Sequence, residues 1–90
     1  MIQVTDGAKA ELRKLLDASV DWPGARLRLL ERSRGILGLG IDIEAEGDHV
    51  VEFEGDKLLL ISDDLASRVG GILLDVDRTP DGMVLVIDEQ

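Results

Sequence analysis

The sequence contains no cysteine, so its 90 residues must fold without disulfides or thiolate-bound metal. A chain of this length buries only roughly 60–65% of the surface that it exposes when unfolded. Its stability must therefore come from packed side chains alone. Apolar residues make up 44% of the sequence but aromatic residues only 2%, so Leu, Ile and Val must build the core. This composition is typical of one globular domain over residues 1–90 and differs from that of a disordered chain.

The formal net charge of −9 limits the classes of partner. Nucleic acids and anionic membrane surfaces bind clustered Lys and Arg, so we expect neither as a partner. Basic proteins and metal cations are favoured, although solubility explains the acidic excess more simply. No apolar run reaches the roughly 20 residues of a membrane span, and the N-terminus lacks the pattern of a secretory signal. We therefore predict a cytoplasmic location.

Apolar residues at helical spacing predict a first helix. It begins at Thr5 or Asp6, either of which can cap the helix by accepting a backbone N–H. It ends near Ser19, because the Trp22-Pro23-Gly24 stretch cannot continue a helix. The stripe that would face the core consists of Ala8, Leu12, Leu15 and Leu16.

The acidic pair Asp63-Asp64 predicts the start of a second, shorter helix. Both carboxylates would lie at the positive end of the helix dipole, with Arg68 near the negative end. The Gly70-Gly71 pair would then end the helix. This placement explains the two carboxylates without an acid–base role.

Alternating apolar segments between turn signals predict seven strands. The Gly55-Asp56 pair is typical of the two-residue loop of a hairpin, and the stretch Thr79 to Gly82 is typical of a turn. Short connections favour antiparallel pairing, so we expect an α+β fold with mostly antiparallel or mixed strands, an N-terminal helix and a short second helix. The predicted strands run from Ile2 to Val4, Arg26 to Leu29, Ile41 to Glu44, Val50 to Glu54, Lys57 to Ile61, Ile72 to Asp77 and Met83 to Ile87.

Three motifs follow one another in an informative order: Val4-Thr5-Asp6-Gly7-Ala8, Arg26-Leu27-Arg28-Leu29 and Gly35-Ile36-Leu37-Gly38. Their order and spacing resemble those of the A-type (HesB/IscA-like) iron–sulfur cluster assembly domain along essentially the whole chain. The resemblance implies a HesB-like domain over residues 1–90. Each motif is short, so the order of the motifs carries the resemblance.

The resemblance also implies a cluster site that this sequence does not complete. In the family, the Gly-x-x-Gly stretch reads Gly-Cys-Ser-Gly, and a Cys-Gly-Cys tail supplies two more thiolates. Ile36 and Leu37 stand here at the Cys and Ser positions, and the sequence ends at Gln90 without such a tail. We therefore expect a domain that keeps the scaffold and has lost the cluster site, with no residue assigned to a cofactor or a metal.

These expectations lead to a non-enzymatic, HesB/IscA-like domain with an accessory or protein-binding role. The expected partners are iron–sulfur assembly or target proteins. Self-association is also expected, because family members form dimers or tetramers and the strand from Met83 to Ile87 offers an edge. Two alternatives stay open: a protein-interaction module unrelated to iron, and a weak metal binder built from carboxylates.

The glycine-rich run of residues 35–40 is the candidate interaction site. A phosphate-binding loop is disfavoured, because the order is G-x-x-G-x-G and the run leads into a strand. The favoured interpretation is a glycine-kinked strand whose Ile and Leu are part of the core, and the alternative is an exposed apolar patch that contacts another chain. The residues of this run are Gly35, Ile36, Leu37, Gly38, Leu39 and Gly40.

The remaining candidates for chemistry have simpler explanations. His49 is the only histidine, and its offset from Glu46 and Asp48 favours a solvated turn residue over a metal ligand. The acidic stretch Asp75 to Gly82 lacks the spacing of a calcium loop and is typical of a turn. No nucleophile stands beside a base in a known motif, so we predict no catalytic residue.

Overall fold

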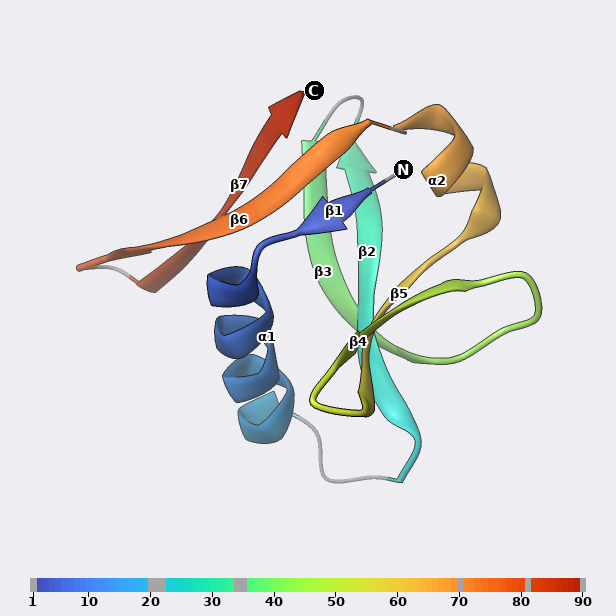
Figure 1. Cartoon of the computed structure of the whole chain (residues 1–90), viewed down its shortest axis with the longest axis horizontal. Coiled ribbons are helices and arrows are strands. Elements are labelled where there is room, and N and C mark those ends of the chain that lie inside the picture. Colours follow the sequence, from blue (N-terminus) through green and yellow to red (C-terminus); the bar gives the residue numbers. More distant parts are fainter. Residues whose placement is uncertain (1, 20–22, 34–35, 70, 81, 90) are drawn as a thin grey trace.

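The computed structural model describes residues 2–19, 23–33, 36–69, 71–80 and 82–89, and Figure 1 shows the chain. Within these ranges it contains two helices and seven strands, as the sequence predicts. In chain order they are β1 (Gln3–Val4), α1 (Asp6–Ser19), β2 (Ala25–Ser33), β3 (Ile36–Ile43), β4 (His49–Phe53), β5 (Asp56–Ile61), α2 (Asp63–Arg68), β6 (Ile72–Thr79) and β7 (Gly82–Glu89).

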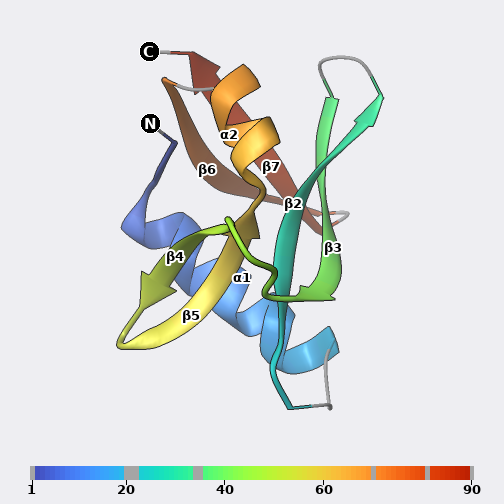
Figure 2. The same cartoon turned by 90° about the vertical axis from the view of Figure 1, so that its right-hand side faces the viewer.

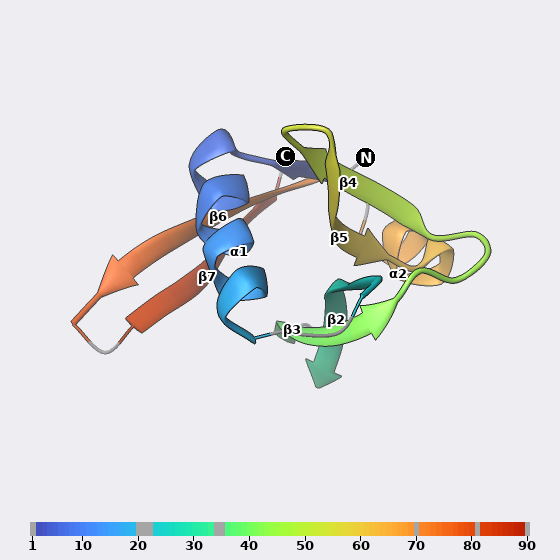
Figure 3. The same cartoon turned by 90° about the horizontal axis from the view of Figure 1, so that it is seen from below.

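The strands form two sheets with α1 between them. One sheet has the order β3-β2-β5-β4 and the other the order β1-β6-β7. Because α1 contacts β6 of the smaller sheet and β2, β4 and β5 of the larger one, it joins the two sheets (Figure 3). The β1–β6 and β2–β5 pairs are parallel and the other three are antiparallel. The predicted α+β fold with mixed strands is therefore confirmed.

The first helix has the cap and the buried stripe expected from its sequence. Thr5 Oγ1 accepts the backbone N–H of Ala8 at 3.1 Å and so satisfies one of the free donors of the first turn. Ala8, Leu12 and Leu16 are buried, and Leu15 packs at the margin of the core. Neither described helix is long and apolar enough to cross a membrane.

The core consists almost entirely of leucine. Strand β5 lies between β2 and β4 in the larger sheet, and its last four residues, from Leu58 to Ile61, are all buried. A continuous apolar run is typical of a strand that is covered on both faces. The buried cluster comprises Leu12, Leu16, Leu27, Leu29, Leu58, Leu59, Ile61, Leu65 and Leu74.

The second helix follows β5 directly (Figure 2) and is held by its own cap. Ser62 Oγ accepts the backbone N–H of Leu65 at 3.2 Å, and the Leu65 side chain is buried. At the other end, the backbone N–H of Val69 donates to the Leu65 carbonyl. The predicted helix start at Asp63 is confirmed.

The hairpin between β4 and β5 differs by one residue from the predicted loop. The two loop residues are Glu54 and Gly55, with φ of 52° and 84°, rather than Gly55 and Asp56. A tight hairpin of this kind requires positive φ at both central residues, and Glu54 adopts it while Asp56 pairs with Phe53. The predicted loop was wrong by one residue because only one of the two positions with positive φ, Gly55, is a glycine.

Strands β2 and β3 are longer than predicted. The predicted strands covered Arg26 to Leu29 and Ile41 to Glu44, whereas β2 and β3 have 9 and 8 residues. The glycine-rich run was interpreted as a kinked strand, and cross-strand pairing with β2 continues past both glycines of β3. Tertiary pairing therefore overrides the low strand propensity of glycine.

Candidate functional site

The candidate interaction run forms the first part of β3 rather than a loop. Gly35 lies outside the described residues, and residues 36–40 pair with β2. Leu37 and Leu39 are half-buried and pack against the core, whereas Ile36 is 60% exposed. The interpretation as a core strand is thus correct for the two leucines and wrong for Ile36.

The two glycines of this run leave room for side chains of the neighbouring strand. A Cβ atom on Gly38 would lie 2.7 Å from Arg32 Nε, and one on Gly40 would lie 2.7 Å from Leu30 Cδ1. The Arg32 side chain crosses β3 above Gly38, and its Nη2 donates to the Leu39 carbonyl at 2.6 Å. Arg32 lies where the β2–β3 register shifts, and such a bulge redirects a side chain.

Among the residues whose side-chain exposure the structure describes, the exposed large apolar side chains lie on strand β3. Besides Ile36 they are Ile41, which is 39% exposed, and Ile43, which is 54% exposed. Ile41 and Ile43 stand opposite the buried Leu27 and Ala25 of β2, so they extend the core-facing side of the sheet beyond the core. In the described part of the chain β3 is also a terminal strand, with no strand along its outer edge. Side chains of Arg32, Asp42 and Arg28 bond main-chain groups of β3 at Leu39 and Ile43.

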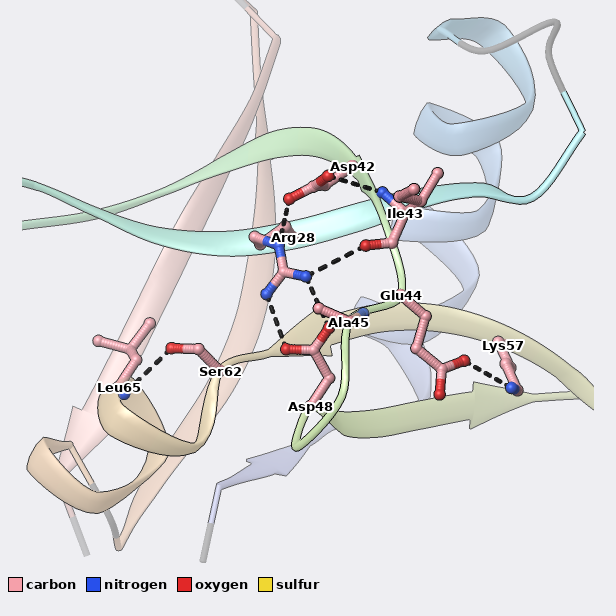
Figure 4. A network of polar contacts seen from close by, with 9 residues as sticks. All are labelled: Arg28, Asp42, Ile43, Glu44, Ala45, Asp48, Lys57, Ser62 and Leu65. Carbon is pink, nitrogen blue, oxygen red and sulfur yellow. Dashed lines mark hydrogen bonds and ion pairs between the residues drawn. The ribbon is translucent and has the colours of Figure 1, made fainter.

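The connection that follows β3 is fixed by one arginine (Figure 4). Arg28 Nη1 and Nη2 donate to the two carboxylate oxygens of Asp48 at 2.9 and 2.6 Å, and Arg28 Nε donates to Asp42 at 2.7 Å. Asp48 Oδ2 also accepts the Ala45 backbone N–H at 2.7 Å. The Arg28 and Asp48 side chains are only 12% and 4% exposed, so this is a shielded, two-pronged ion pair.

The electrostatics of this pair follow from its hydrogen bonds. The bonds from Arg28 lower the pKa of the Asp48 carboxyl below its ordinary value, against the opposing effect of burial. The same bonds raise the pKa of the Arg28 guanidinium. Asp48 therefore stays charged and serves as an anchor for the β3–β4 connection, which positions Ile43 and the acidic residues around it.

His49 has a partner that its sequence neighbours do not reveal. It lies at the start of β4, and its Nε2 is 2.9 Å from Asp63 Oδ1 at the start of α2. Asp48 beside it is committed to Arg28. The expected solvated turn histidine is exposed, but it is a strand residue with a carboxylate partner 14 positions away. No local sequence signal indicates a contact at that separation.

The other predicted acidic candidates have structural roles. Asp75 accepts a hydrogen bond from Thr5 Oγ1 at 2.7 Å, which lowers the pKa of the Asp75 carboxyl and joins the start of α1 to β6. Asp77 lies on β6, and Asp81 of the same stretch lies outside the described residues. Asp64 pairs with Arg68 on the surface of α2.

Two surface cavities lie away from β3. One of about 430 Å³ is lined by Ile2 and by residues of β4, β5 and α2, among them His49, Asp63 and Ser67. Another of about 270 Å³ near the end of α1 is lined by Arg13, Arg26 and other residues. Across the described ranges, His, Asp and Glu side chains form no group of three that could hold a metal ion.

The fold is similar to the solved structures of SufA and IscA. The Escherichia coli SufA structure, of a protein involved in the biosynthesis of iron–sulfur clusters, has a TM-score of 0.72 at 20% identity, covering 98% of this chain and 84% of SufA. The crystal structure of IscA with a 2Fe–2S cluster has a TM-score of 0.65 at 17% identity, covering 99% of this chain and 85% of IscA. These similarities confirm the HesB/IscA-like fold that the motifs predicted.

A third similar structure has a higher sequence identity. The solution NMR structure of a protein from Aquifex aeolicus has a TM-score of 0.71 at 28% identity, covering 99% of this chain and 91% of that protein. No protein-family model matches the sequence, and no curated protein matches it either. The similarity to known proteins therefore rests on the fold, and this fold occurs here in a sequence without cysteine.

Proposed function

We propose that this chain, which has the HesB/IscA-like fold without any cysteine, is a non-enzymatic accessory domain of iron–sulfur cluster assembly that binds proteins. One observation carries the proposal. Ile36, which stands where the resemblance implies the first cluster-ligating cysteine, is 60% exposed at the start of β3. An exposed apolar residue at this position favours a protein contact.

The chemistry of the site argues against cluster ligation by this chain. Iron–sulfur clusters are held by soft thiolate ligands, in some cases with histidine, and an isoleucine has no lone pair to donate. These 90 residues contain no thiolate and one histidine, which is paired with Asp63 on α2. The proposed role is therefore contact with proteins that handle clusters, in the cytoplasm, and not transfer through this domain's own ligands.

Anaerobic reconstitution tests the loss of the cluster site. The purified protein is incubated with ferrous iron and sulfide, desalted, and analysed for iron, sulfide and visible absorbance, with a cysteine-containing IscA protein as the positive control. We expect a colourless protein without stoichiometric iron. A brown protein with matched iron and sulfide would show that oxygen or His49 ligands hold a cluster, and would overturn this part of the proposal.

Retention of partners tests the protein-binding role. The immobilised domain is incubated with purified iron–sulfur scaffold and target proteins, and we expect it to retain at least one of them. Ile36→Asp and Leu37→Asp should each weaken this retention. Gln3→Glu, which adds the same charge on β1, is the matched control and should leave it unchanged. Equal retention by the Ile36→Asp variant and the unaltered domain would contradict the proposed contact.

Self-association is a separate part of the proposal. Strand β7 is the terminal strand of the smaller sheet, so its outer edge is free for pairing in the described part of the chain. Sedimentation velocity over a range of concentrations tests this. A single monomeric species at every concentration would remove self-association while leaving the protein-binding role intact.

A further inference from the structure

The second half of β3 lies at an edge of the larger sheet and carries two kinds of exposed side chain, apolar and acidic. Ile41 and Ile43 lie on one face of the strand and Asp42 on the other, and Glu44 follows the strand directly. The isoleucines are 39% and 54% exposed, and the side chains of Asp42 and Glu44 are 51% and 41% exposed. An apolar row and acidic groups are thus available together at one sheet edge.

We propose that this edge binds an extended basic segment of a partner protein, in which Lys or Arg alternates with apolar residues and which adds to the sheet as a strand beside β3. This inference rests on the proposed protein-binding function and specifies the partner's chemistry. An added strand forms main-chain hydrogen bonds with the edge and presents alternate side chains to the two faces. Its apolar residues then meet Ile41 and Ile43, and its basic residues meet Asp42 and Glu44.

The apolar face has space for an added side chain. A shallow cavity of about 180 Å³ lies beside this end of β3 and reaches the helix α1. Ile41 of β3 and Leu15 of α1 both line this cavity, so an apolar side chain of the added strand can bury surface against both elements. The cavity is lined by Leu15, Leu27, Leu39, Gly40 and Ile41.

The acidic groups can change partners at small cost. Asp42 contacts Arg28 and also accepts the backbone N–H of Ile43 at 2.8 Å. When Asp42 turns away, Arg28 remains held by both oxygens of Asp48, and a carbonyl of the added strand can accept the Ile43 N–H in its place. Glu44 pairs with Lys57, and both side chains are close to half-exposed, so that ion pair is solvent-screened and readily exchanged. Binding a basic strand therefore leaves no buried charge without a partner.

Charge also distinguishes the basic partner from a second copy of this chain. A second copy would bring its own net charge of −9, and its own Asp42 and Glu44, to the same edge. Like charges across neighbouring strands are destabilising, whereas opposite charges attract from a distance and speed association. The occupant with the best complementarity is therefore a basic strand.

Binding of a designed peptide tests the inference. The probe is a fluorescent peptide as long as β3 in which Lys alternates with Val, and its control contains the same residues with the lysines and valines in separate blocks. We expect the alternating peptide to bind more tightly and to shift the backbone NMR signals of β3. Binding should weaken as salt rises from about 0.05 to 0.5 M, because exposed charges are screened.

Matched variants separate local recognition from overall charge. Asp42→Asn with Glu44→Gln should weaken binding by roughly three- to tenfold, as expected for two lost cross-strand charge pairs. Glu52→Gln with Glu54→Gln makes the same change in net charge at β4, the other terminal strand of this sheet, and at the hairpin loop that follows it. This control should leave binding within about twofold, since it removes no pair at β3.

Three outcomes would overturn the inference. They are equal weakening by both double variants, peptide-induced shifts confined to β4 or β7, and pairing of two copies through β3 that the peptide does not displace. If peptide binding fails while Ile36→Asp still weakens partner retention, the strand-addition mode is wrong and the proposed function stands. If the peptide binds β3 but no iron–sulfur protein is retained, the edge site stands and the link to cluster assembly is wrong.

Discussion

The carboxylate of Asp48 accepts several hydrogen bonds near the end of β3. Its side chain is 4% exposed and accepts bonds from Arg28 and from the Ala45 backbone. We expect Asp48→Asn to lower the free energy of unfolding by about 1–3 kcal/mol at neutral pH, because it weakens a charge-assisted bond and leaves Arg28 less well paired. Urea unfolding at neutral pH measures this change.

The same residue predicts a dependence on pH. The pKa of Asp48 is lowered in the folded protein, so its contribution is complete above the unfolded value of about 3.9 and is lost as the pH falls through the lower folded value. The difference between Asp48→Asn and the unaltered protein should therefore shrink below about pH 4. Asp64→Asn, at an exposed ion pair, is the control and should change stability by less than about 0.5 kcal/mol.

Two glycines should respond differently to the same substitution. In Gly38→Ala the new Cβ meets the Arg32 side chain between Cγ and Nε, and this exposed side chain can move at the cost of its bond to the Leu39 carbonyl, so we expect a loss of less than about 1 kcal/mol. In Gly55→Ala the Cβ meets nothing within 4 Å, but φ is +84°. That conformation should cost about 1–2 kcal/mol. A larger loss at Gly38 than at Gly55 in thermal unfolding would contradict this account.

Sequence reasoning at the residue scale works where the cause is local. The cap at Thr5 and the dipole placement of Asp63 depend on neighbours along the chain, and both are found. The exposure of Ile36 and the contact between His49 and Asp63 depend on how elements that are distant in sequence are placed in the fold. No pattern in one sequence reports such packing, so these features had to come from the structure.

At the scale of elements, Thr5 joins α1 to β6. Its Oγ1 accepts the Ala8 N–H and donates to Asp75, so one hydroxyl caps the helix and fixes its start against the smaller sheet. Thr5→Ala should lower stability by about 1–2 kcal/mol, whereas Thr5→Ser should retain most of it. Chemical denaturation compares the variants, and equal losses in both would show that the methyl group, rather than the hydroxyl, matters.

The elements themselves were largely predictable, and their ends were not. Apolar periodicity identifies α1 and the strand that contains Leu27 and Leu29, because each buries one face. The ends of β3 and the hairpin at Glu54 depend on pairing with distant strands, which overrides local preference. The HesB/IscA-like architecture followed from the order of the motifs rather than from any single element.

At the scale of the whole molecule, α1 packs against both sheets, so its burial stabilises both of them. Leu12 is fully buried on this helix, which contacts strands of both sheets. Leu12→Ala should lower the free energy of unfolding by about 2–5 kcal/mol through the cavity that it leaves. Hydrogen exchange should report this loss equally in β5 and β6. Destabilisation of only one sheet would show that the sheets unfold independently.

The pairing of β1 with β6 also has a consequence for biosynthesis. Gln3 pairs with Leu73, and the hydroxyl of Thr5 reaches a carboxylate 70 positions away. While the chain emerges from a ribosome, the first strand and the first turn of α1 therefore wait for their partners until most of the domain has been made. Contacts between such distant segments also slow folding, because a long loop must close before they form. The domain therefore completes its fold only after β6 has been synthesised and has left the ribosome.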